Sequence, residues 1–195
     1  ERLGELEALH TVSAAQRTAQ TQDDASAILL DESLRALEID AGCIWVRDES
    51  NTHLRLVAVR GWCHVLTDAN FGSGEGITGS VFATGTPYMA QEIDTDPRGA
   101  AALRSVTPPG WSGAWTPIRT NADIAGVLFV ALPPSRRLTP DQLKLLTSLA
   151  ELAGSFLQRL QLLQQAQEQA QLTRRIIETV PEGLVLLDAA SCILL

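Results

Sequence analysis

One stretch of the sequence decides the fold: Gly74-Glu75-Gly76-Ile77-Thr78-Gly79-Ser80-Val81-Phe82-Ala83-Thr84-Gly85-Thr86-Pro87. It predicts a short helix over residues 77–84 with Gly85 just past its end, because glycine readily adopts the left-handed conformation that ends a helix. The earlier glycines permit positive φ and let a helix start close to a sheet. The stretch is also formally a G-x-G-x-x-G, and Asp94 follows at the distance that a dinucleotide-binding fold requires. No strand leads directly into the first glycine, however, and repeated parallel strand–helix units are missing, so the structural interpretation is preferred.

The residues before this stretch predict two helices and a hairpin. Leucines at helical spacing indicate a first helix over residues 1–20. Asp23-Asp24 offers an N-cap for a second helix, which Asp40-Ala41-Gly42 closes. Residues 43–46 are apolar and residues 54–60 alternate between apolar and polar, so these two segments predict strands joined across a polar turn.

The residues after it predict further short elements and a second hairpin. Residues 87–90 are a strand candidate. Asp94 to Arg98 predicts the start of a capped helix, with Pro97 in or near the first turn. Residues 112–119 and 122–132 predict two strands that turn at Thr120-Asn121.

A long helix closes the pattern. Thr139-Pro140-Asp141 opens it, and no proline follows until Pro181. Residues 140–157 are expected to pack on the sheet, whereas the glutamine-rich part beyond Leu160 leaves only a narrow apolar stripe. A 4-3 spacing with polar breaks at Gln167 and Arg174 predicts a coiled-coil seam, and therefore a parallel homodimer. The seam residues are Leu149, Phe156, Leu160, Leu163, Ala170 and Ile177.

Composition excludes several classes of protein. The formal net charge is −8, which argues against binding to nucleic acid or to anionic membranes. No apolar run approaches the roughly 20 residues that a membrane span needs. Three cysteines at unrelated spacings favour a reducing cytoplasm over a disulfide framework, and three scattered histidines give no motif for a metal site.

The order of these segments resembles the GAF domain family. The glycine-rich stretch is similar to the family signature G-x-G-I-x-G-x-V-x-x-T-G-x-P, and Asp94 to Arg98 resembles the acidic loop that follows it. The hairpin over 115–128 and the start of the last helix at 138–141 also match. The resemblance implies an α+β fold, a central antiparallel sheet flanked by helices, with long helices at both ends.

A second resemblance begins at residue 175, where Arg175 to Asp188 looks like the opening of a PAS domain. The expected organisation is an N-terminal helix over 1–22, a GAF domain over 23–158, a coiled-coil linker over 159–178 and the start of a PAS domain over 179–195. This order is similar to that of bacterial sensor histidine kinases and of cyclic-dinucleotide enzymes.

The resemblance implies a cytoplasmic sensory domain that binds a small molecule and signals through its exit helix to a PAS domain and a catalytic module. The aromatic and polar residues beside the loops, where the family's cavity opens, are the candidate ligand-binding residues. They are Trp62, Cys63, His64, Phe71, Tyr88, Asp94, Trp111 and Trp115. The first alternative is a ligand-free dimerisation and relay module with a filled core. No catalytic residue is expected in this chain, and no motif names a cofactor.

Other ligands and activities of the fold are weaker alternatives. The pair Cys63-His64 resembles a bilin attachment site, but it precedes Gly74 instead of following it. Haem bound through His64 or His53 is a further alternative. The family's cyclic-nucleotide motif needs an Asn-Lys pair, and the single lysine, Lys144, follows a leucine. A thiol oxidoreductase would need a reactive thiolate with a resolving partner, from Cys43 and Cys63.

Overall fold

The computed structural model describes residues 10–11, 19, 21–48, 50, 52–66, 69–121, 123–179, 186–187 and 193–194. The chain divides into two compact units, residues 1–158 and residues 159–195. The helix expected over 1–20 lies almost wholly outside the described residues, as does most of the expected start of a PAS domain over 179–195. In the second unit, β7 (Leu186–Leu187) pairs antiparallel with β8 (Ile193–Leu194).

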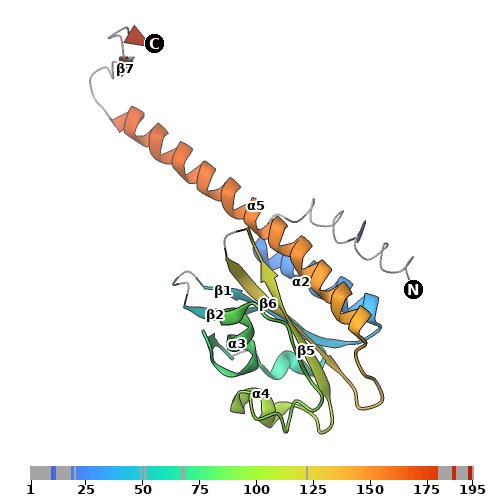
Figure 1. The fold of residues 1–195 in the computed structure, drawn as a ribbon. Coiled ribbons are helices and arrows are strands. Elements are labelled where there is room, and N and C mark those ends of the chain that lie inside the picture. Colours follow the sequence, from blue (N-terminus) through green and yellow to red (C-terminus); the bar gives the residue numbers. More distant parts are fainter. Residues whose placement is uncertain are drawn as a thin grey trace. The chain divides into compact units, whose positions relative to one another are not determined.

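The first unit is built on one antiparallel sheet (Figure 1). Its strands are β1 (Ala41–Arg47), β2 (His53–Arg60), β3 (Phe71–Gly72), β4 (Tyr88–Ala90), β5 (Ser112–Arg119) and β6 (Ile124–Leu132). Their order in the sheet is β3-β2-β1-β6-β5-β4, and every pair is antiparallel. Both predicted hairpins are confirmed, and so is the α+β fold class.

Helices cover both faces of this sheet (Figure 1). One face carries α2 (Gln22–Leu37) and the first part of α5 (Pro140–Thr179). The other carries η1 (Gly61–Leu66), α3 (Gly76–Thr84) and α4 (Ala101–Val106). Because neighbouring side chains of a strand point to opposite faces, Ile44 of β1 packs under α2 and α5, whereas Trp45 packs under α3.

The glycine-rich stretch does what its sequence predicts. Helix α3 spans Gly76–Thr84, and Gly85 follows in the left-handed conformation at φ 67° with its N–H bonded to the carbonyl of Val81. At Gly79 the helix runs so close to β3 that an added Cβ would lie 2.2 Å from the carbonyl oxygen of Gly72. The glycines therefore set the approach of helix to sheet, which is the structural interpretation of the motif.

Two helix starts differ from the prediction. Helix α2 is capped by Thr21, whose Oγ1 accepts a hydrogen bond of 3.1 Å from the N–H of Asp24. Asp23-Asp24 is therefore in the first turn and is not the cap. The segment 94–98 does not begin a helix either, because Asp96 closes a turn by accepting the N–H of Arg98 at 2.8 Å, and α4 starts at Ala101. The structure also adds η1, which the sequence did not predict.

Candidate functional site

A cluster of aromatic rings fills the sheet face beneath α3. Trp45, Phe71, Trp115 and Phe129 are all at most 2% exposed. Trp115 stacks on Phe129 with 4.6 Å between ring centroids, and Trp45 contacts Phe71 edge-on at 5.4 Å. The indole N–H of Trp115 donates to Oγ1 of Thr78 in α3 at 3.1 Å. Phe71 and Trp115, both candidate ligand residues, thus form part of a packed core.

Two other candidates, Trp62 and Trp111, form a pair at the edge of this core. Their ring centroids are 5.8 Å apart and the rings are nearly perpendicular, an arrangement that favours aromatic contact. Both residues are partly buried. The indole nitrogen of Trp62 is buried and has no hydrogen-bond partner among the described residues. A buried donor left without an acceptor is energetically costly.

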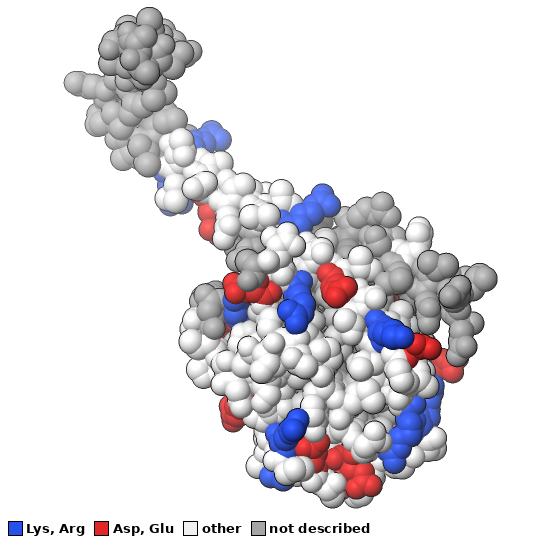
Figure 2. Space-filling model, in the orientation of Figure 1, with Lys and Arg blue, Asp and Glu red and all other residues white. Residues whose placement is uncertain are grey.

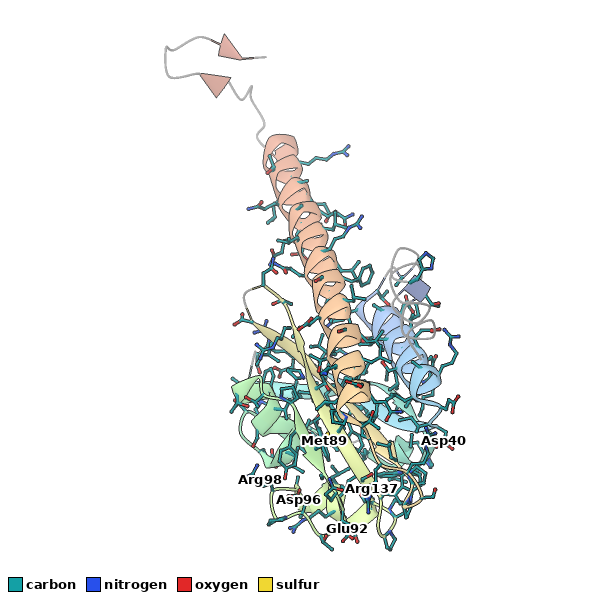
Figure 3. All side chains as sticks on the ribbon, turned by 45° about the vertical axis from the view of Figure 1, so that its right-hand side comes forward. Asp40, Met89, Glu92, Asp96, Arg98 and Arg137 are labelled. Atoms are coloured by element: carbon teal, nitrogen blue, oxygen red, sulfur yellow. The ribbon has the colours of Figure 1, made fainter. Side chains whose placement is uncertain are left out.

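The candidates Tyr88 and Asp94 lie near this core and form hydrogen bonds with different partners. Asp94 accepts a long hydrogen bond of 3.4 Å from the N–H of Gly110. The hydroxyl of Tyr88 donates to Oδ2 of Asp96 at 2.7 Å, and the guanidinium of Arg98 lies 5.2 Å from the Tyr88 ring centroid. Figure 3 shows Asp96 and Arg98 on the loop that follows β4.

Asp96 and Arg98 were not among the candidates. The acidic loop of the family resemblance contains them, but the sequence alone does not tell which of its two aspartates meets Tyr88. Partial burial and the neighbouring Asp96 carboxylate raise the pKa of Tyr88 above 10.0, while Arg98 opposes that shift.

Among the described residues, two thiols are buried and His64 is exposed. Cys43 and Cys63 are free and fully buried, and burial, followed by the neighbouring Cys63 thiol, raises the pKa of Cys43 well above 9.0. His64 is exposed, and its Nδ1 lies 2.8 Å from the carbonyl oxygen of Gly61. Within the described ranges, no three His, Cys, Asp or Glu side chains gather as a metal site.

The predicted dimer residues divide along α5. Leu149 is fully buried in its own domain, so it has no exposed surface to offer a second chain. Phe156 is partly buried against the same core. In the second unit Leu160 is partly exposed, Leu163 is 51% exposed and Ala170 is exposed. The side chain of Ile177 lies outside what the structure describes.

Surface charge and helix hydropathy add two observations. On the visible face in Figure 2, acidic and basic side chains are interspersed. Among the helices of the described part, none combines the length and the apolar character that a membrane crossing demands.

Comparisons with known proteins agree on one family. The family model of the GAF domain matches residues 19–158. No curated protein matches the chain significantly. Among solved structures, the GAF domain of A. aeolicus nlh2 in an inactive state superposes with a TM-score of 0.67 at 18% identity, covering 80% of this chain and 97% of that one.

Two more solved structures show how varied the similar proteins are. The GAF domain of a phosphoenolpyruvate-protein phosphotransferase from Coxiella burnetii gives a TM-score of 0.70 at 16% identity, covering 80% and 94% of the two chains. Free methionine-R-sulfoxide reductase from Neisseria meningitidis, in complex with its substrate, gives 0.65 at 17% identity, covering 78% and 87%. At such identities the likeness establishes the fold alone.

Proposed function

The chain belongs to the GAF domain family, and on that premise we propose that it is a regulatory module that pairs with a second copy of itself and relays a change of state along α5. GAF domains are common sensory and regulatory domains. The relay acts on a domain that follows α5. The resemblance of residues 175–188 to the opening of a PAS domain supports a PAS and catalytic module, as in sensor histidine kinases, in that place.

The observation that carries this proposal is the change in burial along α5. Between Leu145 and Leu157 most of its apolar side chains are buried against the core of the domain, with Leu146, Leu149 and Ala150 at 0% exposure. In the second unit, by contrast, Leu162, Leu163 and Leu172 are 51–59% exposed. A helix whose leucines are buried in one part and exposed in the next is typical of a helix whose exposed part contacts a partner.

Not every exposed leucine lies on the predicted seam. Leu163 lies on the predicted 4-3 spacing with Leu160 and Ala170, whereas Leu162 and Leu172 lie off it. A second copy of the same helix in parallel would bury the seam residues against their own equivalents, as in a two-stranded coiled coil. The homodimer is proposed on this basis.

Light scattering on the 195-residue chain tests the pairing. We expect the mass of a dimer, and we expect Leu163→Glu to reduce it to that of a monomer because a charge would be buried in the seam. Gln165→Glu is the matched control, since it adds the same charge to an exposed position off the seam and should leave the dimer intact. A monomer for the unsubstituted chain at the highest concentration reached would refute the proposal.

The packed sheet face favours a relay without a large ligand beneath α3. The rings of Trp45, Phe71, Trp115 and Phe129 occupy that space themselves. The burial of Cys43 argues against a thiol oxidoreductase that uses it as nucleophile, because a nucleophilic thiol needs exposure and a lowered pKa, and Cys43 has neither.

Binding of a small molecule at the predicted site is a second candidate, favoured by the unpaired indole N–H of Trp62. A ligand there would place a hydrogen-bond acceptor against this donor. Native mass spectrometry of freshly purified protein, with an absorbance scan, tests it together with bilin and haem. A bound mass that disappears in Trp62→Phe supports this candidate, and protein that carries no added mass and no visible absorbance argues against it.

A further inference from the structure

A cavity of about 430 Å³, open to the surface, lies at the end of the sheet where β1 ends and the β5–β6 hairpin turns. The last turn of α3 contributes Phe82 and Ala83 to its wall, and the start of β6 contributes Ile124. Arg47 at the end of β1, Arg119 at the end of β5 and Asp123 of the turn are its charged lining residues. None of these is a candidate ligand residue from the sequence. The volume falls within the range of small-molecule sites.

Both arginines are held in place by contacts within the domain. The guanidinium of Arg47 forms an ion pair with Asp123 at 3.3 Å, and the Arg47 side chain is only 22% exposed. The guanidinium of Arg119 donates to the carbonyl oxygen of Gly85, the residue that ends α3. A guanidinium has five N–H donors, so each arginine keeps donors for a ligand after making these contacts.

The charge and shape of the lining select a class of ligand. Two guanidinium groups and one carboxylate leave a surplus of one positive charge in a chain whose net charge is −8. Arginine pairs with carboxylate groups through two parallel hydrogen bonds. Phe82, Ala83 and Ile124 offer an apolar wall beside these donors. A small organic anion with one carboxylate and an apolar body matches both parts.

The β5–β6 hairpin that lines this cavity also contacts α5. The backbone N–H of Asn121 donates to Oε1 of Gln158 at 3.0 Å. At Gly154 the helix runs so close to β5 that an added Cβ would lie 1.6 Å from the carbonyl oxygen of Arg119. Arg119 thus lines the cavity with its side chain and contacts α5 with its backbone.

We propose that this cavity binds a small organic monocarboxylate, held by Arg47 and Arg119 with its apolar part against Phe82 and Ile124, and that occupancy is coupled to α5 through the β5–β6 hairpin. Binding at this site does not depend on the proposed function, whereas the coupling to α5 rests on the proposed function. A ligand can shift α5 between two states only by binding the domain more tightly in one of those states than in the other. Hairpin and helix share two direct contacts, so a ligand that orders Arg119 also orders the backbone that α5 meets.

Calorimetric titration of the 195-residue chain with benzoate tests the site, with benzamide as the uncharged analogue of the same shape. We expect saturable binding of benzoate that is about tenfold or more tighter than that of benzamide, because a charge-assisted pair is lost. Arg47→Gln and Arg119→Gln should each weaken benzoate binding by a similar factor. Arg55→Gln is the matched control, since Arg55, like Arg47, forms an ion pair with an aspartate, Asp23, but lies outside the cavity lining.

Ala83→Trp provides a variant that keeps every charge. Ala83 is an exposed position of α3, so the indole ring of the introduced tryptophan should fill the cavity without disturbing the core. We expect benzoate binding to be lost. Equal binding of benzoate and benzamide, no binding of benzoate to the unsubstituted chain, unchanged binding to Ala83→Trp, or equal weakening by Arg55→Gln would each overturn the site.

Hydrogen exchange tests the coupling separately. Saturating benzoate should slow amide exchange in residues 150–158 of α5, and Gln158→Ala should remove much of this effect while benzoate still binds. Binding without any change of exchange in α5 overturns the coupling and leaves the site. The dimer mass from light scattering depends on neither result, so failure of the pairing proposed above is recognised on its own.

Discussion

Gly154→Ala gives the sharpest test of how α5 meets the sheet, because two physical effects of opposite sign act on one residue. Alanine in place of glycine inside a helix normally favours folding by about 1 kcal/mol. Here the new Cβ would lie 1.6 Å from the carbonyl oxygen of Arg119 and 2.5 Å from its carbonyl carbon. Real Cβ atoms essentially never come within 3.0 Å of such an atom.

The helix and the strand would therefore have to part by at least 1.4 Å at this point, the shortfall between 1.6 and 3.0 Å. Both sides of the contact are backbone, so no side chain can rotate away to relieve it. Overpacking costs about 1–3 kcal/mol in a typical core, and a backbone clash belongs at the upper end. After the gain in helix propensity is subtracted, we expect a net loss of stability of about 2 kcal/mol or more.

Urea denaturation followed by circular dichroism measures this loss, with the midpoint and the slope fitted separately. In thermal unfolding the same loss corresponds to a fall of about 4–8 °C in Tm for a domain of this size. Ser155→Ala is the matched control, because Ser155 is the next residue of α5, is exposed, and its hydroxyl donates to the carbonyl of Glu151 in the same helix. It should change stability by no more than about 0.5 kcal/mol. A Gly154→Ala protein as stable as the unsubstituted chain would refute the close approach of α5 to β5.

Three further predictions follow from single contacts. The chain has one tyrosine, so ultraviolet titration should show Tyr88 ionising above pH 10.0, with Asp96→Asn lowering that pKa and Arg98→Gln raising it; the opposite order would contradict the contacts. Burial raises the pKa of Cys43 above its ordinary 9.0, so unfolding releases a proton above that pH. Stability should therefore fall more steeply past pH 9.0 in the unsubstituted chain than in Cys43→Ala, and urea midpoints at pH 8 and pH 10 measure the difference. Arg136 donates to the last carbonyls of α2, so Arg136→Ala should cost about 1–2 kcal/mol in urea unfolding, and no change would remove that role.

Much of the fold could be predicted from the sequence because its signals are local. Alternation over 54–60 identified β2, and glycine at position 85 identified the end of α3, since each depends on neighbours within a few residues. The start of α4 could not be predicted in this way. Asp96 can either cap a helix or close a turn; in the structure one carboxylate oxygen accepts the N–H of Arg98 and the other accepts the hydroxyl of Tyr88.

The candidate site was less predictable because burial is decided by tertiary packing. Strand β5 is buried at all but its last residue, so its sequence carries no alternation to show that Trp115 belongs to the core under α3. Trp62 and Trp111 were both named as candidates beside loops, but their mutual contact depends on η1, which the sequence did not predict. The pairing of Arg47 with Asp123 joins residues that are far apart in the chain, and no spacing rule reaches across it.

The distribution of burial also bears on where a ligand could act on α5. Strands β1 and β6 are packed on both faces, and a close-packed core resists small displacements because its side chains have no vacant alternatives. The turn from Arg119 to Asp123 differs, because it is short, largely exposed and bonded to α5 at Gln158. A ligand of modest affinity can reorder such a turn without repacking the rings under α3. The end of the sheet at Arg119 is therefore where we expect a ligand to act on α5.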